Sequence, residues 1–75
     1  MMFEEDTLVE VKFPLNREEE SGSRENWSWL PGVVITCCGD NEYQILVEDE
    51  RLRDKDMTYP VCFRDPTEIR SPVLK

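Results

Sequence analysis

Histidine is absent from this 75-residue chain, which also has only three cysteines, three glycines and nine basic residues. Without an imidazole there is no Ser/His/Asp or Cys/His set for nucleophilic catalysis and no histidine for general acid–base work. The cysteines, Cys37, Cys38 and Cys62, form no C-x-x-C pair, so the pattern of a structural zinc site is missing. Their odd number argues against a disulfide framework and fits a reducing compartment. We therefore expect no enzyme, no cofactor and no metal.

Long apolar runs are missing as well. No stretch approaches the roughly 20 residues that span a bilayer, and the N-terminal MMFEEDT is acidic where a secretory signal would be basic. The composition predicts a single soluble, intracellular domain with a modest hydrophobic core.

Positive charge is scarce: 17 acidic residues against 9 basic ones give a formal net charge of -8. Binding to nucleic acid needs a positive surface that displaces counterions, so this charge disfavours it. A peptide rich in lysine and arginine would be attracted instead. The alternative is that the charge only keeps a small domain soluble.

Alternation of apolar and polar residues predicts a strand at LVEVKF, residues 8–13. WLPGVVITCC and EYQILVED flank the turn residues GDN, so residues 29–48 are expected to form a β-hairpin. Pro31 should lie at the start of its strand or on an exposed edge, because it cannot donate to the ladder. TYPVCF, residues 58–63, is expected to be a short edge strand because it carries Pro60.

The segments between these strands are polar. Residues 14–26 are expected to be a long surface loop, since Gly22 and three adjacent glutamates weaken a helix there. Residues 49–57 form a charged link with room for one helical turn, and Ile69 is expected to dock and close the fold. The fold class is therefore all-β, a small, strongly bent antiparallel barrel of four to five strands with loops at one rim.

The stretch NWSWLPGVV contains two tryptophans. If Leu30 and its alternate neighbours face the interior, Trp29 begins at the rim and faces outward. Trp27 and Trp29, near Tyr59 and flanked by carboxylates, would then form an aromatic pocket with a negative wall, which suits a methylated ammonium group. The alternative is that one or both indoles cover the open end of a very small core.

Five segments carry a resemblance to a known family: LVEVKF, WSWLPGVVITCC, EYQILVED, ERLRDKDMTYP and TEIRSP. Their order and spacing resemble the Agenet/Tudor-like domains of the Royal superfamily, most closely the plant Agenet type and the paired N-terminal domains of the fragile X protein family. The motifs lie at Val9-Glu10-Val11, at Trp29 through Val34, at Tyr43 through Glu48 and at Ile69-Arg70. The resemblance implies an SH3-like barrel of about five antiparallel strands.

The resemblance also implies a non-catalytic reader module that binds methylated lysine or arginine, often on histone tails, through an aromatic cage. Trp29 is the best match to a cage position of the family, and Tyr59 matches a tyrosine of the fragile X type domains. Trp27 joins them by proximity. Asp49 stands where the family usually has a tyrosine, so a carboxylate that takes the cation replaces one wall and favours lower methylation states.

These inferences predict an acidic N-terminal tail at residues 1–7, a Tudor/Agenet-like barrel at residues 8–72 with a variable loop at 14–28, and a C-terminal tail at residues 73–75. The expected partner is a basic peptide or histone tail, with or without methylation. The resemblance implies a nuclear or cytoplasmic protein, and a second tandem unit is common in such domains.

A second hypothesis comes from another functional class. The chain would be a protein–protein docking or assembly domain with a degenerate cage, as the aspartate at position 49 suggests. Such a domain would bind its partner by strand addition, through the strand at residues 58–63 or the edge at residues 8–13.

Overall fold

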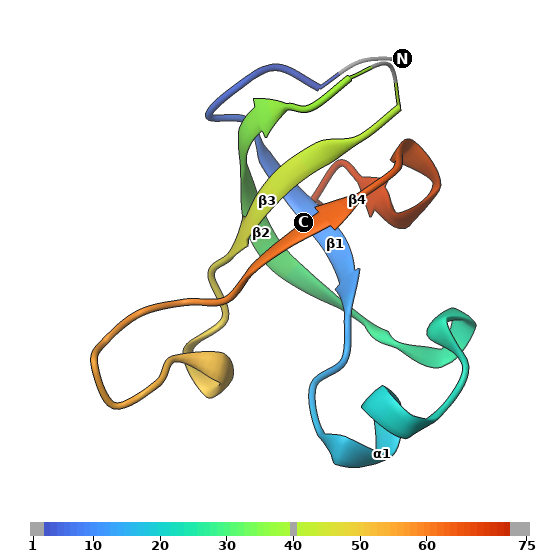
Figure 1. The fold of residues 1–75 in the computed structure, drawn as a ribbon, viewed down its shortest axis with the longest axis vertical. Helices are drawn as coiled ribbons and strands as arrows, with labels where there is room; N and C mark the ends of the chain where they lie inside the picture. The colour runs from blue at the N-terminus through green and yellow to red at the C-terminus, as the bar shows by residue number, and fades with distance from the viewer. Residues whose placement is uncertain (1–2, 40, 73–75) are drawn as a thin grey trace.

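The computed structural model describes residues 3–39 and 41–72. Its five antiparallel strands form one sheet in the order β4-β3-β2-β1-β5, and the sheet curls strongly upon itself (Figure 1). The predicted all-β fold, a small and strongly bent SH3-like barrel, is confirmed by this curled sheet. The strands are β1 Leu8–Phe13, β2 Ser28–Cys37, β3 Tyr43–Val47, β4 Val61–Arg64 and β5 Ile69–Arg70.

Alternate side chains of each strand fill the inside of the curl. In β2, Leu30, Gly32 and Val34 are buried, while Ile35 is exposed and Trp29 half-buried. The predicted phase of this strand, with Trp29 facing outward, is thus confirmed. Ile69 docks as expected, at 4% exposure. The core comprises Val9, Val11, Leu30, Val34, Tyr43, Ile45, Val47, Cys62 and Ile69.

Pro31 does not lie where the sequence predicted. It is an interior residue of β2, which runs between β1 and β3, and it pairs with Glu10 of β1. Its carbonyl oxygen accepts a hydrogen bond from the Glu48 amide at 2.9 Å. The backbone nitrogen and carbonyl oxygen of a strand residue point toward the same neighbouring strand. The Pro31 nitrogen, which carries no hydrogen, therefore faces Glu48, one residue past the end of β3. The β2–β3 ladder thus lacks a donor only beyond its last pair, Gly32 with Val47.

The segment predicted as a long loop contains a short helix, α1 Arg17–Ser21, and a 3-10 turn, η1 Arg24–Asn26. Asn16 caps α1, because its side chain accepts a hydrogen bond from the Glu19 amide. The three adjacent glutamates lie in the first turn of α1. There the partial positive charge of the helix N-terminus favours carboxylates, which outweighs their mutual repulsion.

The β3–β4 and β4–β5 links contain short 3-10 turns, η2 Glu50–Leu52 and η3 Pro66–Glu68, and each turn begins at an aspartate cap. The helical turn expected within residues 49–57 is η2. No helix in residues 3–39 and 41–72 is long and apolar enough to cross a membrane.

The N-terminal residues expected as a tail continue the sheet. The Asp6 amide donates to the Val34 carbonyl at 2.7 Å, and the Val34 amide donates to the Thr7 carbonyl at 3.0 Å. The Phe3 ring meets the buried Tyr43 ring edge to face, with 5.7 Å between the centroids. Residues 3–7 therefore lie against the barrel, and the predicted C-terminal tail at 73–75 falls outside the described residues.

Gly32 of β2 lies too close to β3 for a side chain to fit without a shift. A Cβ on Gly32 would lie 2.9 Å from Ile45 Cγ2 and 3.0 Å from the Leu46 carbonyl oxygen. We expect Gly32→Ala to lower the free energy of unfolding by about 1–3 kcal/mol, because the strands must shift to admit the methyl group. Urea denaturation measures this loss. Gly22→Ala is the control, since its Cβ would approach only α1 carbonyls, the nearer at 3.3 Å; equal losses in both variants would contradict the prediction.

Candidate functional site

Two basic side chains of the same chain lie against the ring of Trp29. Lys12 pairs with Trp29 across β1 and β2, and its Nζ lies 5.2 Å from the ring centroid. The Arg70 guanidinium lies closer, with 4.2 Å between Cζ and the centroid. Arg70 also donates from Nε to Glu10 Oε1 at 2.6 Å. An indole face and a carboxylate thus hold one cation between them on the outside of the barrel.

Trp27 is held in a similar way at the start of β2. The Cζ atoms of Arg24 and Arg64 lie 4.9 and 5.4 Å from its ring centroid. Its indole Nε1 donates to the Glu19 carbonyl in α1 at 2.6 Å. Both indoles are half-buried, and each one contacts cations that this chain supplies itself.

Glu19 fixes α1 to β2 and so sets the position of Trp27. Its Oε1 accepts hydrogen bonds from the Leu15 and Ser28 amides at 3.0 Å each, and its Oε2 accepts one from Ser28 Oγ at 2.9 Å. These bonds, first the one from Leu15, hold the pKa of Glu19 below its ordinary value. The sequence signal for this role was available in the N-cap Asn16 followed three residues later by a glutamate, which is the spacing of a capping box.

Asp49 and Tyr59 lie in the segment that joins β3 to β4. Asp49 is 6% exposed, and its carboxylate accepts from Arg51 Nε at 2.9 Å and from a terminal nitrogen of Arg51 at 2.7 Å. The bonds from Arg51 hold the pKa of Asp49 below its ordinary value. The Tyr59 hydroxyl lies 3.2 Å from Glu50 Oε1, within hydrogen-bond distance.

The structure therefore assigns the four predicted cage residues to two settings. Trp27 and Trp29 contact basic side chains from β1, η1, β4 and β5, whereas Asp49 and Tyr59 contact residues of η2. Trp29 faces outward and Asp49 is buried. A cage built from all four requires Arg51 to leave Asp49 and Arg70 to leave Trp29, and it stays a prediction.

A groove of about 720 Å³ lies beside β4, bordered by η1, η3 and the turn between β2 and β3. Its basic residues already have partners in the chain. Lys12 Nζ donates to the Glu25 and Trp27 carbonyls, and Arg24 pairs with Glu68 at 2.6 Å. Arg64 Nε donates to the Lys12 carbonyl at 2.9 Å. Exposed carboxylates of the same groove, Glu25, Glu42 and Asp65, form none of these ion pairs.

The basic residues around the tryptophans were not identified from the sequence. Alternation placed Lys12 on the outside of its strand, and both Glu10 and Arg70 stood within motifs that the sequence singled out. What was missing is the register, which sets Glu10 opposite Arg70 across β1 and β5. That pairing joins residues too far apart in sequence for any local pattern to reveal.

No family model matches this chain, and neither a curated protein nor a solved structure matches it. Among residues 3–39 and 41–72, no group of three or more His, Cys, Asp or Glu side chains is arranged to hold a metal ion.

Glu19 should make the stability of the fold sensitive to acid. Its pKa in the folded chain lies below the ordinary 4.5, so the carboxylate stabilises the fold above about pH 4.5, and this contribution is lost as the pH falls through the folded-state value. We expect Glu19→Gln to be less stable at pH 7 and to lose less stability on acidification to pH 3. Urea unfolding across this range tests the sign. Glu18→Gln on the same helical turn is the control, and an identical pH profile for both variants would refute the role of Glu19.

Proposed function

We propose that this chain is a non-catalytic module that binds a basic peptide of the class found on histone tails, with a methylated lysine or arginine as its preferred side chain. The proposal rests on one observation, the Arg70 guanidinium held between the Trp29 ring and the Glu10 carboxylate. This arrangement has the two components that recognise a weakly hydrated cation, a π face and a negative charge. It occupies the outer face, where a partner can reach it.

Two further properties support a basic ligand. The net charge of -8 attracts lysine- and arginine-rich segments over several ångströms. The side chain of Arg70 is 45% exposed, and it belongs to β5, which has only two residues. Replacing this guanidinium by a cation from a partner therefore disturbs a surface contact rather than the core.

The expected affinity is modest. A single aromatic contact at an exposed site is worth about 0.5–1 kcal/mol, and the partner must compete with Arg70 for the ring. A Kd in the micromolar range or weaker corresponds to a binding free energy of about 8 kcal/mol or less. A nuclear protein that presents several such modules would bind a modified tail more tightly through their combination.

Substitutions at Trp29 and Arg70 should act in opposite directions. Trp29→Ala removes the π face, so we expect loss of methylation-dependent binding. Arg70→Ala removes the nearer of the two internal cations on the Trp29 ring, so we expect binding about two to five times tighter, which corresponds to about 0.5–1 kcal/mol. Amide NMR titration with unmodified, methyl-lysine and methyl-arginine histone peptides measures both effects.

Arg53→Ala is the matched control for Arg70→Ala. It changes the net charge equally, but its partner is Glu50 in the η2 segment. A gain in affinity shared by Arg53→Ala would assign the effect to net charge alone. Binding that ignores methylation and survives Trp29→Ala would reject the cage and favour a docking domain instead.

A further inference from the structure

Strand β4 lies at one edge of the sheet and, among residues 3–39 and 41–72, pairs only with β3. The Val47 amide donates to the Pro60 carbonyl at 2.9 Å, which identifies this pair as a hydrogen-bonded one. Bonded and non-bonded pairs alternate along an antiparallel ladder. The backbone N–H and C=O groups of Val61 and Phe63 therefore point away from β3, toward the open edge.

A second contact places one of these groups at the edge independently. The carbonyl oxygen of Phe63 accepts a hydrogen bond from the Arg64 side chain at 2.8 Å. A side chain reaches this oxygen because no neighbouring strand in the described residues occupies the position. The oxygen has two lone pairs, so it can accept a second donor from an incoming backbone.

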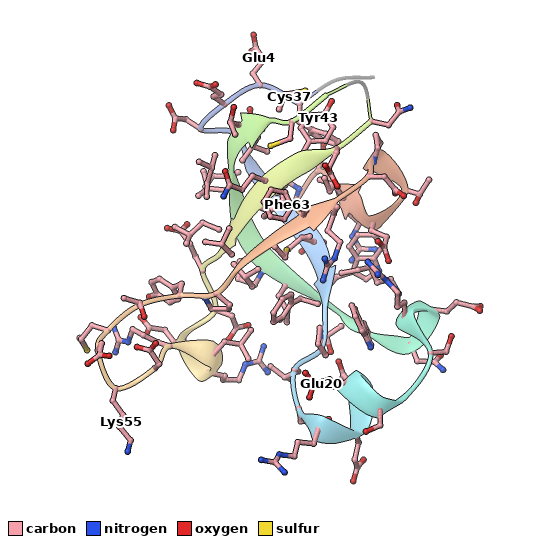
Figure 2. The ribbon with its side chains drawn as sticks, viewed as in Figure 1. Glu4, Glu20, Cys37, Tyr43, Lys55 and Phe63 are labelled. Carbon is pink, nitrogen blue, oxygen red and sulfur yellow. The ribbon has the colours of Figure 1, made fainter. Side chains whose placement is uncertain are left out.

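The side chains along this edge are apolar and exposed. Val61 is 46% and Phe63 is 50% exposed, and Figure 2 labels Phe63 on β4. Val61 ends a row of four aliphatic residues that face each other in register across β1, β2, β3 and β4 on the outer face. The row consists of Leu8, Val33, Leu46 and Val61. An edge strand with exposed apolar side chains is a template for pairing with another strand.

The charges around β4 indicate which kind of strand would pair with its open edge. The groove beside β4 includes the exposed carboxylates of Glu25, Glu42 and Asp65, whereas its lysine and arginines are bound within the chain. Residues 33–49, which include half of β2 and all of β3, contain no lysine or arginine. A second copy of this chain would bring another net charge of -8, so repulsion disfavours self-pairing.

We propose that β4 and its groove bind an extended segment of a basic partner protein, in which aliphatic residues alternate with lysine or arginine. The segment adds to the sheet as a further strand, bonded to the backbone groups of Val61 and Phe63. Its aliphatic side chains continue the outer apolar row, and its basic side chains face the carboxylates of the groove. The inference rests on the proposed function only in that the partner is basic, because the surface is not the Trp29 face.

Amide hydrogen exchange of the whole chain, followed by NMR, tests this geometry. The probe is a short synthetic peptide of alternating valine and lysine. We expect exchange at Val61 and Phe63 to slow at least tenfold, while the amides of Cys62 and Arg64, already bonded to β3, change little. The same peptide with N-methylated backbone at alternate residues, and a version with glutamate for lysine, should both fail to protect these amides.

A pair of matched variants locates the peptide. Phe63→Lys places a positive charge at the edge and should weaken binding of the valine–lysine peptide at least tenfold. Ile35→Lys makes the same change on the same outer face, at a position 39% exposed on β2 away from the edge, and should bind nearly as well as the parent. Equal losses in the two variants would overturn edge binding.

The outcomes also separate this inference from the proposed function. If methylated histone peptides perturb Trp29 while no basic peptide protects Val61 and Phe63, strand addition is overturned and the reader function stands. If protection occurs and Trp29→Ala leaves binding unchanged, strand addition stands without the reader function. Protection that grows with protein concentration in the absence of peptide would make the occupant a second copy and overturn the proposal.

Discussion

The guanidinium of Arg64 holds together a sheet whose two edge strands, β4 and β5, do not pair with each other. Its Nε donates to the Lys12 carbonyl and so joins β4 to β1 across the mouth of the curl. The side chain is only 10% exposed and lies over the rings of Phe13 and Trp27 at 5.6 and 5.4 Å. Arginine suits this position because a planar group with several donors can bond carbonyls and stack on rings at once.

Other features of the molecule follow from this side-chain closure. Because a side chain bridges the strands where a backbone ladder would otherwise run, a groove remains beside β4, and one side of β4 keeps its hydrogen-bonding groups. The same guanidinium covers Trp27 and reaches within 4.0 Å of Glu68, which in turn pairs with Arg24. One residue therefore connects the closure of the barrel, the cover of an indole and the position of η3.

Alternation within single strands, together with the turn residues between them, predicted the all-β fold. It gave β1 its observed bounds and placed Trp29 on the outside. The rule that keeps proline at strand starts or exposed edges failed at Pro31, because it does not tell where the neighbouring strand ends. The count of helix-weakening residues underestimated α1, where the Asn16 cap and the helix dipole offset the repulsion of three glutamates.

The candidate site was harder to predict because it depends on register rather than on phase. A strand pattern states which way a side chain points, but not which side chain stands opposite. Arg70 and Glu10, and likewise Arg24 and Glu68, are brought together only by the complete curl. The outward orientation of Trp29 was therefore predicted correctly, whereas the cations that cover both tryptophans could be found only from the three-dimensional structure.

The pairing of β1 with β5 also bears on how the chain folds. Val11 and Glu10 of β1 pair with Ile69 and Arg70. The pairing of β1 is therefore complete only when β5, which is distant in sequence, has joined it. Folds dominated by such distant pairings form slowly, in milliseconds to seconds, because a long loop must close before its contacts stabilise it. Of the five strands, β5 is synthesised last. Until it has formed, the indole of Trp29 is not covered by the Arg70 guanidinium.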